Sequence, residues 1–195
     1  MSNDFLPEGY EQPKGNSNYL KFEKGETRFR ILSKPIVGWL DWKDKKPLRF
    51  PMDKKPTTPV DPKQAVKHFW AFVVWGYKDE SIQILEITQG TIQTAIKGLT
   101  EDSDWGSPFG YDIKVTKTGD GMETKYAINP SPHKPVTEDV KEAFKAAKVK
   151  LEKLWTNEDP FADSTPPPVK KKEPEFIPTE AISPGNLPDE DDLPF

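Results

Sequence analysis

Residues 68–88 read HFWAFVVWGYKDESIQILEIT, and this stretch decides the fold. Its first ten residues are apolar on both faces, which is typical of a central strand that is covered on both sides. After a short polar turn, residues 81–88 form a second apolar run of strand length. Two such runs joined by a short polar turn predict a β-hairpin. We therefore expect the chain to build its core around a sheet.

Two extended stretches precede this hairpin. Residues 27–33 (TRFRILS) alternate between apolar and other side chains, so Arg28 and Arg30 are expected to point away from the apolar face. Residues 36–43 (IVGWLDWK) follow directly after Pro35 and extend the same long, bent strand.

A helix, a second hairpin and another helix follow the first hairpin. Residues 90–100 place apolar side chains at helical spacing. Residues 111–117 and 122–129 flank TGDG, whose glycines supply the positive φ of a hairpin turn. Residues 136–155 (VTEDVKEAFKAAKVKLEKLW) are amphipathic and predict one long C-terminal helix.

The order of these elements indicates a fold class. The expected order is a long bent strand, two strands, a helix and two further strands. This is the order of an OB-fold, a five-stranded, partly open barrel that commonly binds oligonucleotides or oligosaccharides. We expect a mainly β protein: an OB-fold barrel with a helix between strands 3 and 4, an added C-terminal helix and a disordered acidic tail. Other small barrels remain open at this point.

Charge divides the chain in two. Residues 1–156 carry 25 Lys and Arg against 22 Asp and Glu, a net charge of +3, whereas residues 157–195 carry 3 against 10, a net charge of −7. The second segment also holds nine of the 21 prolines, so it is expected to be disordered. We therefore expect a flexible arm at 1–18, the OB-fold domain with its added helix at 19–156, and a Pro-rich tail at 157–195. NEDPF at 157–161 is interpreted as linker.

The composition argues against several classes of protein. The mean hydropathy is −0.77 and no apolar run approaches the length of a membrane span, so we expect neither a span nor a membrane partner. The N-terminal stretch has no basic start followed by an apolar run, so no secretory signal is expected. The absence of cysteine excludes disulfides and Cys-based zinc sites, and it fits a reducing cytoplasm.

The sequence gives little support for an enzyme. No Walker-type glycine loop is present, and His68 and His133 are far apart in the sequence. A metal-dependent nuclease needs several converging carboxylates. Glu86, Asp112 and Glu123 are scattered over strands, where charge alternation explains them more simply. We expect no catalytic residue, no metal and no cofactor, and we rank a nuclease last.

The stretch from 39 to 77 combines aromatic and cationic side chains. Single-stranded DNA is bound without base readout by cations that follow the phosphates and by rings that stack on bases. Residues 43–67, the expected loop after the first long strand, carry eight Lys and Arg against three Asp, a net charge of +5. About half of the rings are expected to be core instead. The expected DNA contacts are Arg28, Arg30, Trp39, Lys43, Lys45, Lys46, Arg49, Phe50, Lys67, Trp70 and Tyr77.

The last seven residues, DEDDLPF, form a second candidate site. An acid run followed by apolar side chains and a carboxylate suits a small apolar pocket with a basic rim on a partner protein. A tail that only confers solubility would explain the acids but not the leucine and phenylalanine. The expected docking residues are Asp189, Glu190, Asp191, Asp192, Leu193, Pro194 and Phe195.

These residues carry a resemblance to a known family. DEDDLPF resembles the acidic tip of bacterial single-stranded DNA-binding proteins, and YLKFEKGETRFRILSKPIVGW (19–39) resembles bacteriophage single-stranded DNA-binding proteins. The resemblance implies a protein of the host bacterial cytoplasm that coats single strands in phage DNA replication, recombination and repair. It also implies recruitment of polymerase, primase or helicase through the tip. Unlike the phage proteins with a zinc site, this chain has no cysteine.

Two further hypotheses follow from the same residues. An adaptor or inhibitor could imitate the tip to capture host replication proteins without binding DNA, in which case the aromatic side chains of the body would all be core. In a DNA-binding protein, the acidic tail could occupy the basic groove until DNA displaces it, as the charge division suggests.

Overall fold

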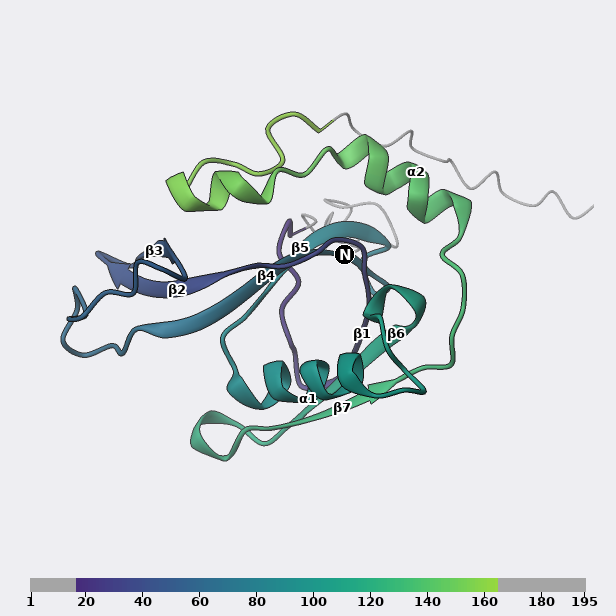
Figure 1. Cartoon of the computed structure of the whole chain (residues 1–195), viewed down its shortest axis with the longest axis horizontal. Helices are drawn as coiled ribbons and strands as arrows, with labels where there is room; N and C mark the ends of the chain where they lie inside the picture. The colour runs from purple at the N-terminus through teal and green to yellow at the C-terminus, as the bar shows by residue number, and fades with distance from the viewer. Residues whose placement is uncertain (1–16, 165–195) are drawn as a thin grey trace, which may run out of the picture.

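A computed structural model describes residues 17–164. Seven strands form an antiparallel sheet, which confirms the mainly β class (Figure 1). The described residues exclude most of the N-terminal segment expected to be flexible (1–18). They also exclude the chain beyond residue 164, with the C-terminal tip. The elements are β1 (Gly25–Ile31), β2 (Ile36–Lys43), β3 (Lys46–Pro51), β4 (Lys67–Gly76), β5 (Ser81–Ile87), α1 (Gly90–Glu101), η1 (Pro108–Gly110), β6 (Asp112–Thr118), η2 (Gly121–Glu123), β7 (Lys125–Pro130), α2 (Glu138–Ala147) and η3 (Leu151–Thr156).

Strand β4 is the centre of the sheet. β5 pairs with one edge of β4, while β2 and β1 follow one another along the other edge. β6 then pairs with β1, and β7 pairs with β6. Between β1 and β2, the Leu32 N–H donates to the Val73 carbonyl at 2.9 Å, and the Ser33 hydroxyl oxygen accepts the Val73 N–H at 2.9 Å. These two bonds connect the β1–β4 pairing with the β2–β4 pairing along this edge of β4.

Both faces of β4 are covered, as its uninterrupted apolar run predicts. On one face, Phe72 and Val74 pack with Phe29 of β1 and with Ile92 and Ile96 of α1. Figure 1 shows α1 lying across this face of the sheet and α2 on the opposite side. The α1 side therefore holds the main core.

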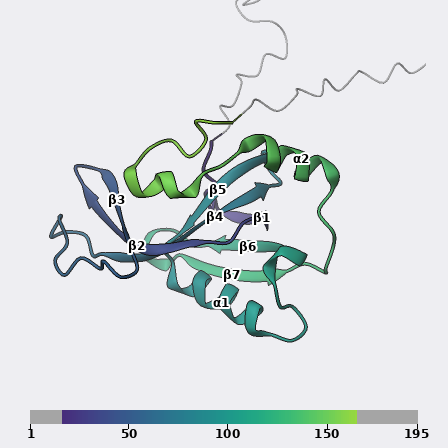
Figure 2. The same ribbon diagram turned by 45° about the horizontal axis from the view of Figure 1, so that its top comes forward.

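The second face of β4 packs against the C-terminal segment of the body. Phe69, Ala71 and Val73 of β4 form a cluster with Leu151 and Leu154 of η3. Figure 2 shows α2 and η3 following one another over this side of the sheet. This segment encloses a second, smaller core.

The prediction of one long helix over residues 136–155 is wrong. α2 ends at Ala147, and Lys148 adopts a left-handed conformation with a φ of 43° before η3 begins. A left-handed residue turns the chain, so the second half of the apolar stripe reaches the sheet as a separate short helix. Phe161 packs in the same cluster at 9% exposure, so NEDPF (157–161) belongs to the folded body and is not a linker.

Strand β3 lies in the segment that was expected to be a loop. The β2–β3 turn is made by Asp44 and Lys45, whose φ values are 50° and 64°, the pattern of a type I′ hairpin turn. β2, β3, the loop at 52–66 and the first half of β4 form a projection, residues 36–71, that we call the arm. Figures 1 and 2 both show the arm extending away from α1. The predicted TGDG turn is confirmed between β6 and β7.

Candidate nucleic-acid interface

Four aromatic rings lie on one face of the arm, and we call them the aromatic strip: Phe50 of β3, Trp39 of β2, and His68 and Trp70 of β4. Trp39 stands directly opposite both Phe50 and His68, and paired residues of neighbouring strands share a face. The Trp39 and His68 rings meet edge to face with centroids 5.4 Å apart. All four side chains are half-buried, so each is fixed by packing and keeps some open surface.

The strip continues the core face of the sheet. Trp70 packs against the α1-side core, and the His68 Nδ1 lies 3.2 Å from the Gln93 Oε1 of α1. The strip therefore begins beside the start of α1 and runs outward across three strands. His68 was not among the predicted contacts, although it alternates in phase with Trp70.

Lysine side chains border the strip. The Lys55 Nζ lies 4.3 Å from the centroid of the Trp39 ring, a cation–π distance. Lys43 and Lys46 are opposite each other on β2 and β3 and are in phase with Trp39. Exposed Lys45 lies in the turn between these strands. Cationic side chains and aromatic faces are the two components of a binding site for single-stranded DNA, and here they lie next to each other.

The lysine-rich loop at 52–66 is held against the arm by a buried carboxylate. Asp41 of β2 is fully buried, and its Oδ2 accepts the Val60 N–H at 2.9 Å. The Trp39 Nε1 donates to the Met52 carbonyl at 3.2 Å. The loop is thus attached at its start and near its middle.

Two predicted contacts on the arm lie away from the strip. Arg49 of β3 points to the opposite face with its side chain 6% exposed, where Nε is 2.7 Å from Glu86 Oε2 and Nη1 is 3.1 Å from Asn157 Oδ1. Its burial takes Arg49 out of the candidate DNA contacts. Lys67 is exposed at the start of β4, also in phase with this opposite face.

Three other predicted contacts lie outside the arm, around a buried carboxylate. Arg30 is 2% exposed; its Nε is 2.5 Å from Asp112 Oδ1, and its Nη1 donates to the Lys134 carbonyl at 2.9 Å. The Tyr77 hydroxyl donates to the same Oδ1 at 3.0 Å. Arg28 also pairs with Asp112 and stacks over the Tyr77 ring, 4.3 Å from its centroid.

This network is a structural ion cluster. Burial raises the pKa of Asp112, but the hydrogen bonds from Arg28, Arg30 and Tyr77 outweigh burial and hold the pKa below its ordinary value. Burial, followed by the bond to Asp112, raises the pKa of Tyr77. Arg30 is too buried to reach a phosphate, whereas the Arg28 side chain keeps 40% of its surface exposed.

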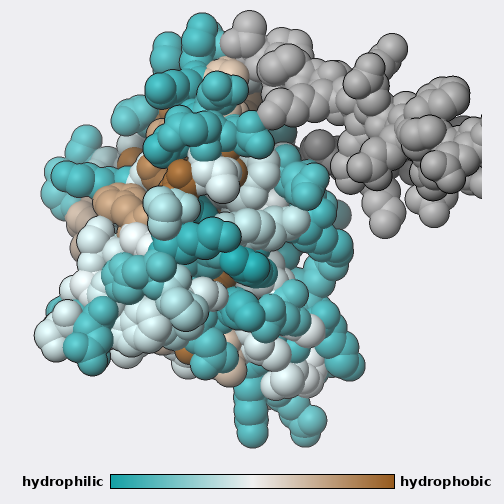
Figure 3. All heavy atoms as spheres, turned by 90° about the vertical axis from the view of Figure 1, so that its right-hand side faces the viewer, coloured by the Kyte–Doolittle hydropathy of each residue, from teal (hydrophilic) through white to brown (hydrophobic). Residues whose placement is uncertain are grey.

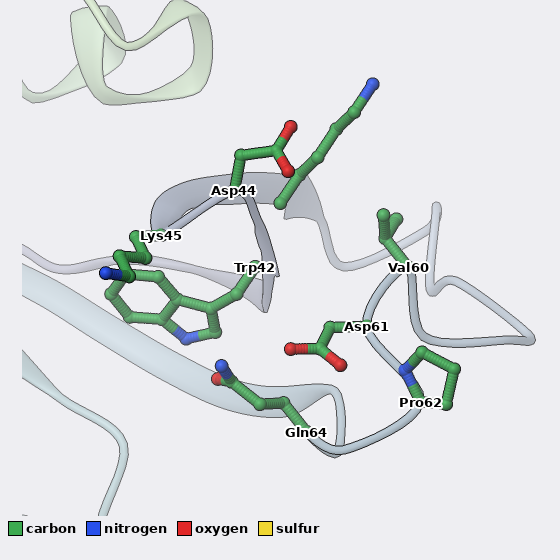
Figure 4. A pocket seen from close by; sticks show the side chains of 8 residues that line it. Trp42, Asp44, Lys45, Val60, Asp61, Pro62 and Gln64 are labelled. Atoms are coloured by element: carbon green, nitrogen blue, oxygen red, sulfur yellow. The ribbon is translucent and has the colours of Figure 1, made fainter.

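An open hollow of about 520 Å³ lies at the tip of the arm (Figure 4). Trp42 projects from β2 on the face opposite Trp39, because the two residues are three positions apart in a strand. The hollow is lined by residues 42–45 of the turn and by Val60, Asp61, Pro62 and Gln64 of the loop.

The remainder of the described surface offers fewer features. Figure 3 views the end of the molecule away from the arm and shows mostly hydrophilic side chains with small apolar patches. Within residues 17–164, no group of three or more His, Asp or Glu side chains is placed to hold a metal ion. No helix of this same range is long and apolar enough to cross a membrane.

One curated protein is similar to this chain. The chain is 25% identical to the "Probable ssDNA-binding protein" of Escherichia phage T5 over a 159-residue alignment that covers 63% of this chain and 60% of the relative. The alignment thus spans less than two thirds of the relative's length. No family model and no solved structure gives a match. The resemblance to phage single-stranded DNA-binding proteins that residues 19–39 indicated is confirmed by this relative.

Proposed function

We propose that this protein binds single-stranded DNA on the arm, without base preference along most of the site. The observation that carries the proposal is the aromatic strip, in which half-buried rings share one face with lysine side chains beside them. Stacking on such rings and pairing of cations with phosphates are how sequence-tolerant proteins hold single strands. The similarity to a protein named as a probable ssDNA-binding protein supports it.

The residues divide by role. Trp39, Phe50 and Trp70 would stack on bases, and the lysines would pair with phosphates. Arg28 and Tyr77 would contact DNA only where a strand continues beyond the arm. The proposed phosphate contacts beside the strip are Lys43, Lys45, Lys46 and Lys55. Lys67 would contact a phosphate only where the strand passes to the opposite face of the arm.

We also propose that the body is an OB-fold variant. The order of elements supports this, because β1 and β2 act as one bent strand along β4, and α1 lies between the two hairpins. β3 would be an insertion that extends the arm beyond the usual barrel.

A role in phage replication, recombination and repair is the wider proposal. Residues 189–195 would dock on polymerase, primase or helicase, and the sequence motif alone supports this. The alternative, an adaptor without DNA binding, predicts that the body rings are all core. The half-buried strip favours DNA binding over that alternative.

A fluorescence titration with oligo-dT of increasing length tests the proposal. We expect quenching of tryptophan emission, an affinity that falls with salt as phosphate contacts release counterions, and weaker binding to duplex of the same length. Equal affinity for single strands and duplex, or no binding to oligo-dT, would contradict it. The adaptor alternative predicts the latter result together with capture of replication proteins by the tip.

A further inference from the structure

The hollow at the arm tip has the components of a slot for one planar ligand. Figure 4 shows the Trp42 indole with the Asp61 carboxylate and the Gln64 amide turned toward it. The indole is half-buried and packs against the second core cluster, so its position is fixed. The wall opposite the turn is provided by Val60 and Pro62.

The loop side of this slot is ordered by its own hydrogen bonds. Asp61 Oδ1 accepts the Lys63 N–H at 2.9 Å, and the Asp61 carbonyl accepts the Gln64 N–H at 3.0 Å. Asp41 holds the neighbouring Val60. Among residues 17–164, neither Asp61 Oδ2 nor the Gln64 side-chain amide makes a hydrogen bond, so both are available to a ligand.

We propose that this slot takes a single nucleobase of the bound strand and prefers guanine. The proposal deepens the proposed function and rests on it. Stacking on Trp42 would hold the base, since every nucleobase has a flat π face. Polar groups beside the ring would then select the base by its edge, as they do for bases that are splayed out of a strand.

The edge chemistry favours guanine over the other bases. Guanine presents an acceptor, O6, followed by two adjacent donors, N1–H and N2–H₂. A carboxylate only accepts hydrogen bonds, so Asp61 matches the two donors, and the Gln64 NH₂ can donate to O6. Thymine has an oxygen in place of the second donor. Adenine and cytosine have a ring-nitrogen acceptor in place of N1–H, which a carboxylate repels.

The charges around the slot favour a nucleotide of a longer strand over a free anion. Lys43 and Lys45 are balanced by Asp44 and Asp61, so the ionisable lining sums to zero. A strand lying on the aromatic strip would reach the slot by passing the β2–β3 turn. Lys43 and Lys46 lie on the strip side of that turn and could hold its phosphates.

The test compares oligo-dT with the same oligomer carrying one central guanine, adenine or cytosine, using the full chain. We expect the guanine oligomer to bind at least about fivefold more tightly, the lower end of what one bidentate base contact supplies. Replacing that guanine by hypoxanthine, which lacks the N2 amino group, should remove much of the gain.

The Asp61→Asn variant should lose the guanine preference and still bind oligo-dT. Its amide oxygen can still accept the Lys63 N–H, so the loop should keep its shape. Asp53→Asn removes the same charge from an exposed position of the same loop and should keep the preference. This control separates base readout from a general gain in phosphate attraction.

The outcomes distinguish the two proposals. If oligo-dT does not bind, the proposed function fails. If oligo-dT binds but all four bases give equal affinity, or if Asp61→Asn keeps the preference, only the slot is overturned.

Discussion

Trp39 lies where three strands of the arm meet. Its partners on either side are Phe50 and His68, its Nε1 is bonded to the loop, and Lys55 lies over its ring. A ring held in this way loses little conformational freedom when a base stacks on it, which makes it the strongest single candidate for DNA contact.

Trp39→Ala should therefore weaken binding of oligo-dT by roughly 1–3 kcal/mol, the contribution of one stacked base. The measurement is fluorescence anisotropy with labelled oligo-dT. Trp105→Ala is the matched control, because Trp105 packs on Tyr111 and His133, outside the arm. An equal loss of affinity in both variants would show that the effect is one of stability and not of contact.

Asp112 should be a stability residue. Asp112→Asn leaves Arg30 buried without its counter-charge, which should lower the free energy of unfolding by roughly 3–5 kcal/mol. The control, Glu26→Gln, breaks a pair with Lys114 whose side chains are 53% and 37% exposed, and it should cost less than about 1 kcal/mol. Urea unfolding of both variants checks this expectation.

The same carboxylate gives an expected pH dependence. Its pKa is lowered by folding, so its contribution to stability is complete above the ordinary value of 3.8 and is lost as the pH falls below it. The protein should therefore lose stability in that acid range, with a smaller acid slope in Asp112→Asn. Identical slopes in the two proteins would refute the assignment.

The sequence could predict which way the arginines point but not what they meet. Alternation correctly placed Arg28 and Arg30 away from Phe29. Their partner Asp112 lies more than 80 residues along the chain, and only the pairing of β1 with β6 brings it near. Exposure therefore could not be deduced from phase alone, and the burial of the Arg49 side chain against Glu86 could not be deduced for the same reason.

At the scale of the element, the arm depends on the segment that packs behind it. A Cβ on Gly38 of β2 would lie 2.2 Å from the Phe50 carbonyl oxygen and 2.9 Å from Cη2 of the Trp155 ring. Trp155 of η3 also meets Phe69 edge to face, with centroids 5.8 Å apart. Only glycine permits this close approach of β2, β3 and η3.

Gly38→Ala should force these elements apart and destabilise the protein by about 1–3 kcal/mol, as overpacking does. Gly98→Ala is the matched control, because a Cβ there meets nothing within 4 Å. In the interior of α1 that control should stabilise by about 0.5–1 kcal/mol. Thermal unfolding would show the opposite shifts, and equal shifts would contradict the packing argument.

The elements that the sequence predicted are those with a clear period or an unbroken apolar run. β4, β5, α1 and the β6–β7 hairpin follow apolar patterns that local chemistry alone explains. β3 was not predicted because Pro47 and Pro51 lie near its ends and because its turn has Asp44–Lys45 where Asn and Gly are usual. The end of α2 before Lys148 was also not predicted, since lysine normally favours a helix.

For the whole molecule, charge separates the body from the tail. Residues 1–156 carry +3 and residues 157–195 carry −7, so the tail can compete with phosphates for the lysines of the arm. The competition is a hypothesis drawn from the sequence, and the tip lies outside the described residues.

Deleting residues 187–195 removes four carboxylates of the tip and should raise the affinity for oligo-dT, most strongly at low salt, where charges are least screened. Titrations at several salt concentrations measure this effect. If both the affinity and its salt dependence are unchanged, the tail does not compete for the DNA site.

The Ser33 hydroxyl closes the gap between β1 and β2 along one edge of β4. Its consequence concerns cooperativity: with Val73 paired, no unpaired amide separates the arm half of β4 from the core half. Amide hydrogens from Lys67 to Gly76 should then exchange with solvent as one unit, at the rate of global opening. Ser33→Ala would divide that unit. The amide hydrogens of the arm half of β4 would then exchange faster than those of the core half, by local opening of the arm.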